Sequence, residues 1–224
     1  MKSMNYYLLR REWLQYRSFG KSWLLVWAIY LGLYLLMGIS ASFVITFLPI
    51  IMTYSAVYTV KQAGEAVGAG TEDFLLPVPL RQVLWARYQF AFLVGLASSV
   101  VVVCAILLRQ LLNPAEKLNL LFTIGSAMAY SAVITGGSMP LLYKFGATRG
   151  RFTLLVLMGL AAALGGSAAI VGMSAIGGMP NSAGYGIAAC AALLWALMPF
   201  SLRLTERFYR QGGVDHERHP IVEG

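Results

Sequence analysis

Residues 88–108 read YQFAFLVGLASSVVVVCAILL, a run of 21 residues without a charged side chain. An α-helix of this length rises about 30 Å, which is the thickness of the hydrocarbon core of a bilayer. A helix also satisfies its own backbone hydrogen bonds, as every segment that crosses lipid must. The stretch therefore predicts a transmembrane helix, and the chain is predicted to be a membrane protein.

Three further tracts lack charged residues, and they cover 39, 26 and 51 residues at 22–60, 118–143 and 152–202. The first and last are long enough for two helices each, and both contain Gly, Ser or Pro near the middle, where a turn can form. The sequence thus predicts an all-α integral membrane protein with a six-span transmembrane domain at 22–202. The six spans are placed at 22–38, 43–60, 88–108, 118–142, 152–173 and 184–202.

Basic residues are concentrated in alternate connections between these spans. The segments 1–21, 61–87, 143–151 and 203–224 hold 5, 3, 3 and 4 Lys and Arg residues, whereas the other loops hold only Arg109 and Lys117. Because basic loops remain on the cytoplasmic side, both termini are predicted to face the cytoplasm, with 203–224 as a cytoplasmic tail. The same rule explains the net charge of +8, so we do not predict binding to nucleic acid.

The N-terminal segment 1–21 has a helical aromatic pattern. Tyr6, Leu9, Trp13 and Tyr16 are spaced three and four residues apart, which places them along one side of a helix. We therefore predict an interfacial helix with its rings at headgroup depth. The alternative is a basic flank that only orients the first span.

The loop between spans two and three combines acidic, apolar and rigid elements. Thr71 can cap a short helix that carries Glu72 and Asp73 in its first turn, and Pro77 and Pro79 stop it before a new helix begins at Leu80. This pattern indicates a docking surface, with a loop resting on lipid headgroups as the alternative. Its residues are Glu72, Asp73, Phe74, Leu75, Leu76, Pro77, Pro79 and Arg81.

Ionisable residues are absent from the middle of the six predicted spans. Ion-coupled carriers need such groups to bind their ion, and an intramembrane hydrolase needs a base beside its nucleophile. Two motif fragments do not change this. Gly20-Lys21-Ser22 lacks the first glycine of a phosphate-binding loop, and the histidines of His216-Glu217-Arg218-His219 are too close for the zinc motif HExxH. We expect no enzymatic activity, metal or cofactor on this chain, and any energy must come from a partner.

Hydroxyl side chains form two short stripes inside the spans. Thr46 and Thr53 lie seven residues apart on span two, and Ser131 and Thr135 lie four apart on span four. These stripes are candidates for lining a transport pathway. Interhelical hydrogen bonding is the other use of such residues.

Two local stretches, together with the six-span plan, resemble the membrane subunit of ABC-2 type transporters, in particular small bacterial permeases without a fused ATPase. The first is TEDFLLPVPLR at 71–81, followed by Ala86-Arg87-Tyr88, and the second is PLLYKFG at 140–146. The chain departs from the family pattern at Pro79, where Ser is frequent, and in the basic residues Arg149 and Arg151.

The resemblance implies two permease subunits, identical or different, in a bacterial plasma membrane, each above a separate ATPase that binds ATP and Mg²⁺. It implies a cytoplasmic coupling helix between spans two and three, whose surface against the ATPase is the element from Glu72 to Leu76, backed by Pro77 and Pro79. It also implies a second cytoplasmic loop at Lys144, Phe145 and Gly146. It further implies alternating access, usually export of amphipathic peptides, antibiotics or lipid-like molecules.

An alternative of the same size is the substrate-binding membrane subunit of an energy-coupling-factor vitamin importer. That protein should present a polar ligand pocket near the outer face. The short, mainly apolar outer loops predicted here disfavour it. An intramembrane lipid-modifying enzyme is a third reading, but Glu72-Asp73 is the only adjacent acidic pair.

Overall fold

The computed structural model describes the backbone of residues 2–19, 21–37, 41–66, 78–112, 120–174 and 181–217. Side chains are described over narrower ranges, chiefly 6–17, 27–36, 44–59, 78–112, 120–146 and 184–211. All regular secondary structure in the described residues is helical, so the predicted all-α class is confirmed there. The helices are α1 (Lys2–Phe19), α2 (Lys21–Met37), α3 (Ala41–Ala66), α5 (Leu80–Leu112), α6 (Leu120–Ser174), α7 (Asn181–Ala196) and α8 (Met198–Glu217).

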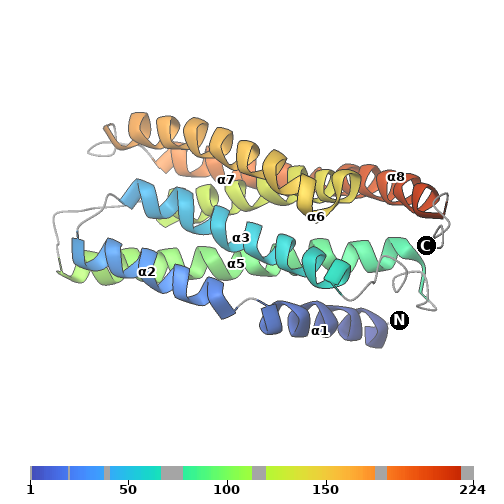
Figure 1. Cartoon of the computed structure of the whole chain (residues 1–224). Helices are drawn as coiled ribbons and strands as arrows, with labels where there is room; N and C mark the ends of the chain where they lie inside the picture. The colour runs from blue at the N-terminus through green and yellow to red at the C-terminus, as the bar shows by residue number, and fades with distance from the viewer. Residues whose placement is uncertain are drawn as a thin grey trace.

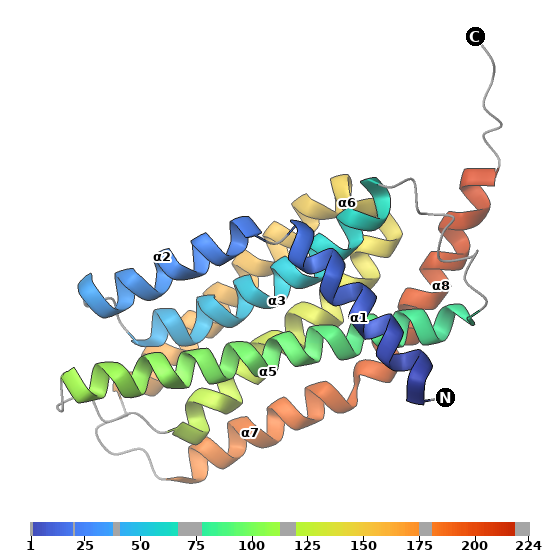
Figure 2. The same cartoon turned by 90° about the horizontal axis from the view of Figure 1, so that it is seen from below.

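The helices form an elongated bundle, and α1 lies at one end of it (Figure 1). The start of α1, the start of α5 and the end of α8 lie at this same end (Figures 1 and 2). We call it the terminal end of the bundle. An even number of crossings would bring the start of α1 and the end of α8 together in this way.

Three stretches are long and apolar enough to cross a membrane, namely Leu80–Leu112, Leu120–Gly146 and Gly184–Gln211. Two shorter apolar stretches, Trp27–Leu36 and Val44–Thr59, belong to α2 and α3. The helices include most of the residues at which spans are predicted. Two of them are longer than their predicted spans, since α3 extends beyond 43–60 and α5 beyond 88–108. A crossing by all six segments remains a prediction.

Gly146 divides α6 into two helices. Its φ of 73° and ψ of 172° are non-helical, and this combination is open almost only to glycine. The two parts of α6 run side by side in opposite directions, and the turn between them lies at the terminal end (Figures 1 and 2). The loop predicted over 143–151 is therefore helical except at Gly146, where one glycine reverses the direction of the chain.

Another break separates α7 from α8 at Leu197. Pro199 has no amide hydrogen to donate, while the amides of Leu197 and Phe200 bond to the carbonyls of Leu193 and Leu197 at 3.0 Å each. Beyond this break α8 continues as one helix to Glu217. No structural boundary exists at residue 203, where the sequence places the start of the tail.

Helix α3 is the central element of the bundle and contacts α1, α2, α5 and α6. Almost every described side chain on it is buried, from Val44 to Thr59. A helix that is apolar on all sides is enclosed by other helices, in contrast to one with a single apolar stripe. Thr46 and Thr53 are accordingly internal positions.

Helix α1 packs against the bundle through one face and leaves two of the predicted interfacial rings exposed. Leu8, Glu12 and Tyr16 are buried, four residues apart, whereas Tyr6 and Trp13 are more than half exposed. Of the predicted stripe of Tyr6, Leu9, Trp13 and Tyr16, only Tyr16 belongs to the buried face, and the place of α1 at a membrane interface stays a prediction. The buried stripe faces α3 and α5, which α1 contacts, and it includes the single acidic residue of the segment.

Candidate functional site: a buried ion pair at the terminal end

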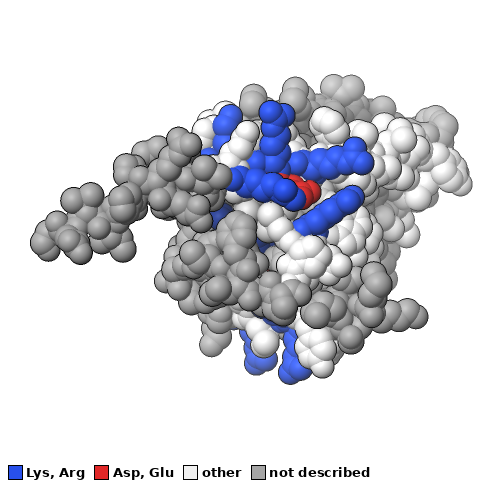
Figure 3. Space-filling model, turned by 90° about the vertical axis from the view of Figure 1, so that its right-hand side faces the viewer, with Lys and Arg blue, Asp and Glu red and all other residues white. Residues whose placement is uncertain are grey.

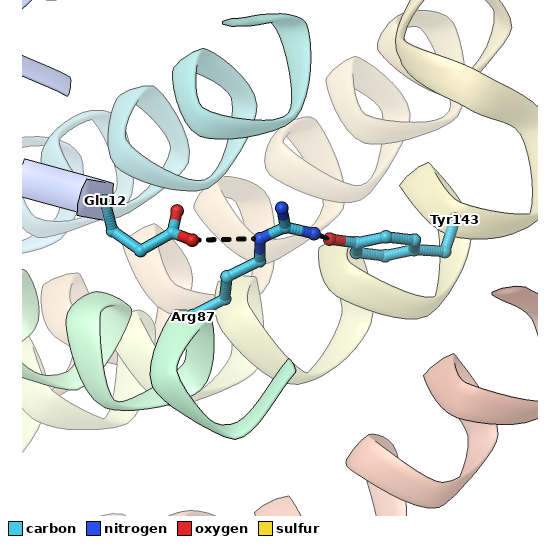
Figure 4. A network of polar contacts seen from close by, with 3 residues as sticks. All are labelled: Glu12, Arg87 and Tyr143. Atoms are coloured by element: carbon cyan, nitrogen blue, oxygen red, sulfur yellow. Dashed lines mark hydrogen bonds and ion pairs between the residues drawn. The ribbon is translucent and has the colours of Figure 1, made fainter. Parts of the chain in front are cut away.

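Three polar side chains from three helices meet inside the terminal end of the bundle. Glu12 on α1, Arg87 on α5 and Tyr143 on α6 retain only 0%, 5% and 7% of their exposure. Figure 4 shows Arg87 between the other two residues, with Glu12 on one side and Tyr143 on the other. We call these three residues the polar joint.

Arg87 makes both contacts of the joint. Its Nε lies 3.3 Å from Glu12 Oε1, and its Nη1 donates a hydrogen bond to the hydroxyl of Tyr143. The planar guanidinium fixes the directions of these bonds, so α1 and α6 are held on either side of α5. Removing one partner of a buried pair leaves the other charge uncompensated and costs about 3–5 kcal/mol. The joint therefore specifies one relative position of the three helices.

The ring of Tyr143 brings two more helices to the joint. Lys61 Nζ on α3 lies 4.6 Å from the ring centroid, a cation–π distance. The ring of Tyr209 on α8 lies 5.3 Å away, measured between centroids. Four helices thus meet at Tyr143, and α1 is connected to it through Arg87.

An apolar cluster supports the joint toward the start of α5. Leu8 on α1 packs with Val83 and Ala86 on α5, and Val78 in the preceding segment covers the cluster. Leu8 and Glu12 are four residues apart, as are Val83 and Arg87, so each apolar residue shares a helix face with its charged neighbour. The apolar contact of Leu8 and the ion pair of Glu12 thus hold together the same faces of α1 and α5.

Sequence reasoning missed this site, although a signal was present. Glu12 is the only acidic residue among the first 21, which contain five Lys and Arg residues. An isolated carboxylate at four-residue spacing from Leu8 and Tyr16 indicates a buried, paired acid. Its partner Arg87 belongs to the Ala86-Arg87-Tyr88 stretch of the family resemblance, but nothing in that stretch connects it to Glu12.

Basic side chains gather on the surface of the terminal end (Figure 3). The helices that reach this end carry exposed Arg10, Arg81, Lys144, Arg207 and Arg210. Glu206 pairs with Arg210 at 2.7 Å on α8. At the opposite end of α5 the described residues include one basic side chain, Arg109, which is buried over the ring of Tyr34 on α2 at 4.6 Å.

A family model described as "ABC-2 family transporter protein" matches residues 8–209. This chain belongs to the ABC-2 transporter family. The matched range begins at the residue that supports the polar joint and ends at the tyrosine that packs on it, so the match includes the whole site. A search of the curated proteins and a search of the solved structures each gave no significant match.

The family resemblance found in the sequence is thereby confirmed, and the chain is a permease subunit of an ABC-2 transporter. Such a permease is a membrane component that does not itself carry out catalysis. Among the described residues, no three His, Cys, Asp or Glu side chains come together as metal ligands.

The structure describes only some of the residues that are predicted to dock an ATPase on this ABC-2 permease. Glu72, Asp73, Phe74, Leu75, Leu76 and Pro77 lie outside the described residues. Pro79 and Arg81 are exposed at the start of α5, which begins at Leu80 as predicted. Lys144 and Phe145 of the second predicted contact are exposed, and Gly146 forms the turn in α6.

The four candidate pathway residues of the permease are all buried. Thr53 Oγ1 donates to Ser131 Oγ at 3.0 Å, which joins α3 to α6. Thr135 Oγ1 donates to the carbonyl of Ser131 at 2.8 Å, one turn back on the same helix. Thr46 is 1% exposed on the central helix. In this conformation, the hydroxyls of Thr53, Ser131 and Thr135 make hydrogen bonds within or between helices.

Proposed function

We propose that this permease is the membrane half of an ATP-driven exporter, and that a separate ATP-binding cassette ATPase docks at its terminal end. The observation that carries this proposal is the family match over 8–209, which spans the membrane helices and the polar joint. Nucleotide and Mg²⁺ would bind to the ATPase. The chain itself would convert the movement of its partner into alternating access.

The terminal end suits a cytoplasmic partner for electrostatic reasons. Its exposed basic residues follow the positive-inside rule, so it would face the cytoplasm of a bacterial plasma membrane. Pro79 and Arg81 are exposed there, directly after the docking surface predicted at 72–77. The acidic residues Glu72 and Asp73 would give that surface a charge opposite to its surroundings, which favours a defined partner over a general attraction to acidic lipids.

The transported molecule would be amphipathic. The helical stretches 88–108 and 120–143 contain no charged residue, so a pathway along them offers hydroxyl and apolar contacts. A peptide, an antibiotic or a lipid-like molecule has the surface that such contacts recognise. A second permease subunit, identical or different, would complete the pathway.

Mild solubilisation of membranes from the native host tests this function. We expect a P-loop ATPase to co-purify with the permease in equal amounts. Reversing two charges with Glu72→Lys and Asp73→Lys should abolish this association while membrane insertion remains normal. A matched control, Glu116→Lys in the predicted outer loop, should retain the ATPase.

Two results would contradict the proposal. Retention of the ATPase by the Glu72→Lys/Asp73→Lys variant would place the docking surface elsewhere. A stable monomer that binds a vitamin and brings no ATPase would favour the vitamin importer instead.

A further inference from the structure

We propose that Glu12, Arg87 and Tyr143 are positioning residues that transmit a displacement of the docking surface to α1 and to the turn at Gly146. This inference rests on the proposed function, because the displacement originates in the ATPase. The three residues would be the mechanical connection between the docking surface and the membrane helices.

The first step is a stiff connection between the docking surface and Arg87. The amide of Gln82 donates to the carbonyl of Pro79 at 2.8 Å, so the first turn of α5 is closed immediately after the proline. From Leu80 the helix is uninterrupted to Leu112. Arg87 lies seven residues along it, about 10 Å at 1.5 Å per residue. A displacement at Pro79 therefore reaches Arg87 without a flexible segment between them.

The second step is the division of this displacement between two helices. Arg87 contacts Glu12 through Nε and Tyr143 through Nη1, and all three side chains are buried. Since little water reaches the site, a movement of α5 cannot exchange these bonds for solvent without a large penalty. The partner helices must follow α5, or the bonds must break. The apolar contacts of Leu8 with Val83 and Ala86 keep α1 attached in the same direction.

The third step brings the movement to the bend in α6. Tyr143 is three residues before Gly146, where the backbone leaves the helical conformation. Backbone torsions at glycine are the least restricted in the chain, so a pull on Tyr143 can change the angle between the two parts of α6. Lys61 and Tyr209 contact the same ring from α3 and α8. Tyr143 is thus the point from which one movement reaches several spans.

Hydrogen exchange on the full-length permease tests the mechanical link without the ATPase. The protein is placed in nanodiscs of phosphatidylethanolamine and phosphatidylglycerol, and variants are compared with wild type. Tyr143→Phe removes one hydroxyl and keeps the ring, so it is the least disruptive change. We expect amide hydrogens near the substitution to exchange at least fivefold faster. We expect the same increase in α1, although Tyr143 belongs to α6. Glu12→Gln should produce the reciprocal effect around 143–150.

The exposed pair of Glu206 and Arg210 supplies a matched control, because both residues lie on α8 four positions apart. Glu206→Gln should change exchange in α8 alone. If Tyr143→Phe leaves exchange in α1 unchanged, the link between α6 and α1 does not exist and the proposal is overturned. Glu12→Gln is not required for that decision, so poor folding of this variant would leave the test intact.

Spin labels test transmission in the complex with the co-purified ATPase. The labels are attached at Tyr6→Cys and Lys144→Cys, which replace exposed residues on α1 and α6, after Cys104 and Cys190 have been changed to Ala. We expect ATP with vanadate to shift the distance between the labels in an otherwise wild-type permease. Tyr143→Phe should reduce this shift by at least half while the ATPase remains bound and hydrolyses ATP at the wild-type rate.

A full shift in the Tyr143→Phe complex would overturn the role of the joint. Loss of ATPase binding in that variant would also overturn it, since the joint would then act on docking. If wild-type permease brings no ATPase, the proposed function fails, whereas the exchange experiment still decides whether the helices are linked. The two failures are therefore distinguishable.

Discussion

Thr53 on α3 donates a 3.0 Å hydrogen bond to Ser131 on α6, and neither side chain is exposed. The bond joins the central helix to the helix that turns at Gly146. A third helix meets it, because a Cβ atom added to Gly95 on α5 would lie 2.8 Å from Ser131 Cβ. The packing of α3, α5 and α6 thus depends on the hydrogen bond between Thr53 and Ser131 and on the absence of a side chain at Gly95, which lies against Ser131.

A double-mutant cycle measures the hydroxyl pair. We expect Thr53→Val and Ser131→Ala each to lower the free energy of unfolding, with an interaction term of about 0.6 kcal/mol, the average for hydrogen bonds between membrane helices. Unfolding of the detergent-solubilised protein in sodium dodecyl sulfate provides the measurement. Strictly additive effects would show that the bond contributes nothing in the folded protein.

Close helix approach at Gly95 predicts a strong effect of one added methyl group. Gly95→Ala should destabilise the permease by about 1–3 kcal/mol, because the new Cβ would force Ser131 or its helix to move. Gly186→Ala is the control, since nothing lies within 4 Å of its added Cβ. Partial recovery in the Gly95→Ala/Ser131→Gly double variant would identify the contact. Equal stability of the two single variants, from the same unfolding experiment, would contradict the observed packing.

The turn in α6 predicts a requirement for glycine at position 146. Both Gly146→Ala and Gly146→Asn should lower the free energy of unfolding, by about 1–3 kcal/mol each, since φ of 73° with ψ of 172° is closed to side chains. Asparagine tolerates the left-handed helical region but not this one. Gly159→Ala, an exposed helical position with open space, is the matched control. Rescue by asparagine would indicate a different backbone conformation.

Burial of Tyr16 on α1 predicts a specific loss of stability at alkaline pH. Desolvation raises the pKa of its phenol to about 12, against a smaller lowering by the hydrogen bond with Ser55. The unfolded chain loses this proton near pH 10, so the contribution is complete below about pH 10 and disappears as pH rises to about 12. Tyr16→Phe should therefore lose less stability than wild type between about pH 9 and pH 11.5, as measured by chemical unfolding. If the free energy of unfolding of wild type and of Tyr16→Phe changes with pH in parallel, Tyr16 is not desolvated.

The sequence predicts the helices well because their signal is local. An uncharged run such as 88–108 has few physical alternatives to a helix in lipid, and the two prolines before Leu80 mark the start of α5. The face that a helix buries is a different matter, since it depends on neighbours distant in the chain. Tyr6 and Trp13 fit an interfacial stripe, yet Leu8 and Glu12 face the bundle, because Val83 and Arg87 of α5 lie there.

The polar joint could not be assembled from sequence alone. Its ion pair joins residues 75 positions apart, and the third member lies 56 positions further along. No short motif connects a residue of α1 to the start of α5 and to the bend in α6. The hydroxyl stripes lie inside helices, and the 3.0 Å bond from Thr53 to Ser131 is a helix contact that spacing alone does not reveal. A role of these residues in lining a pathway stays a prediction.

The central claim is that the terminal end of the bundle faces the cytoplasm, where an ATPase can dock. Cysteine labelling in intact cells tests it, with Arg81→Cys and Leu111→Cys at opposite ends of α5 in a protein whose Cys104 and Cys190 are replaced by Ala. A membrane-impermeant maleimide should label Leu111→Cys in intact cells and Arg81→Cys only after permeabilisation. Labelling of Arg81→Cys in intact cells would place the docking surface outside and contradict the account.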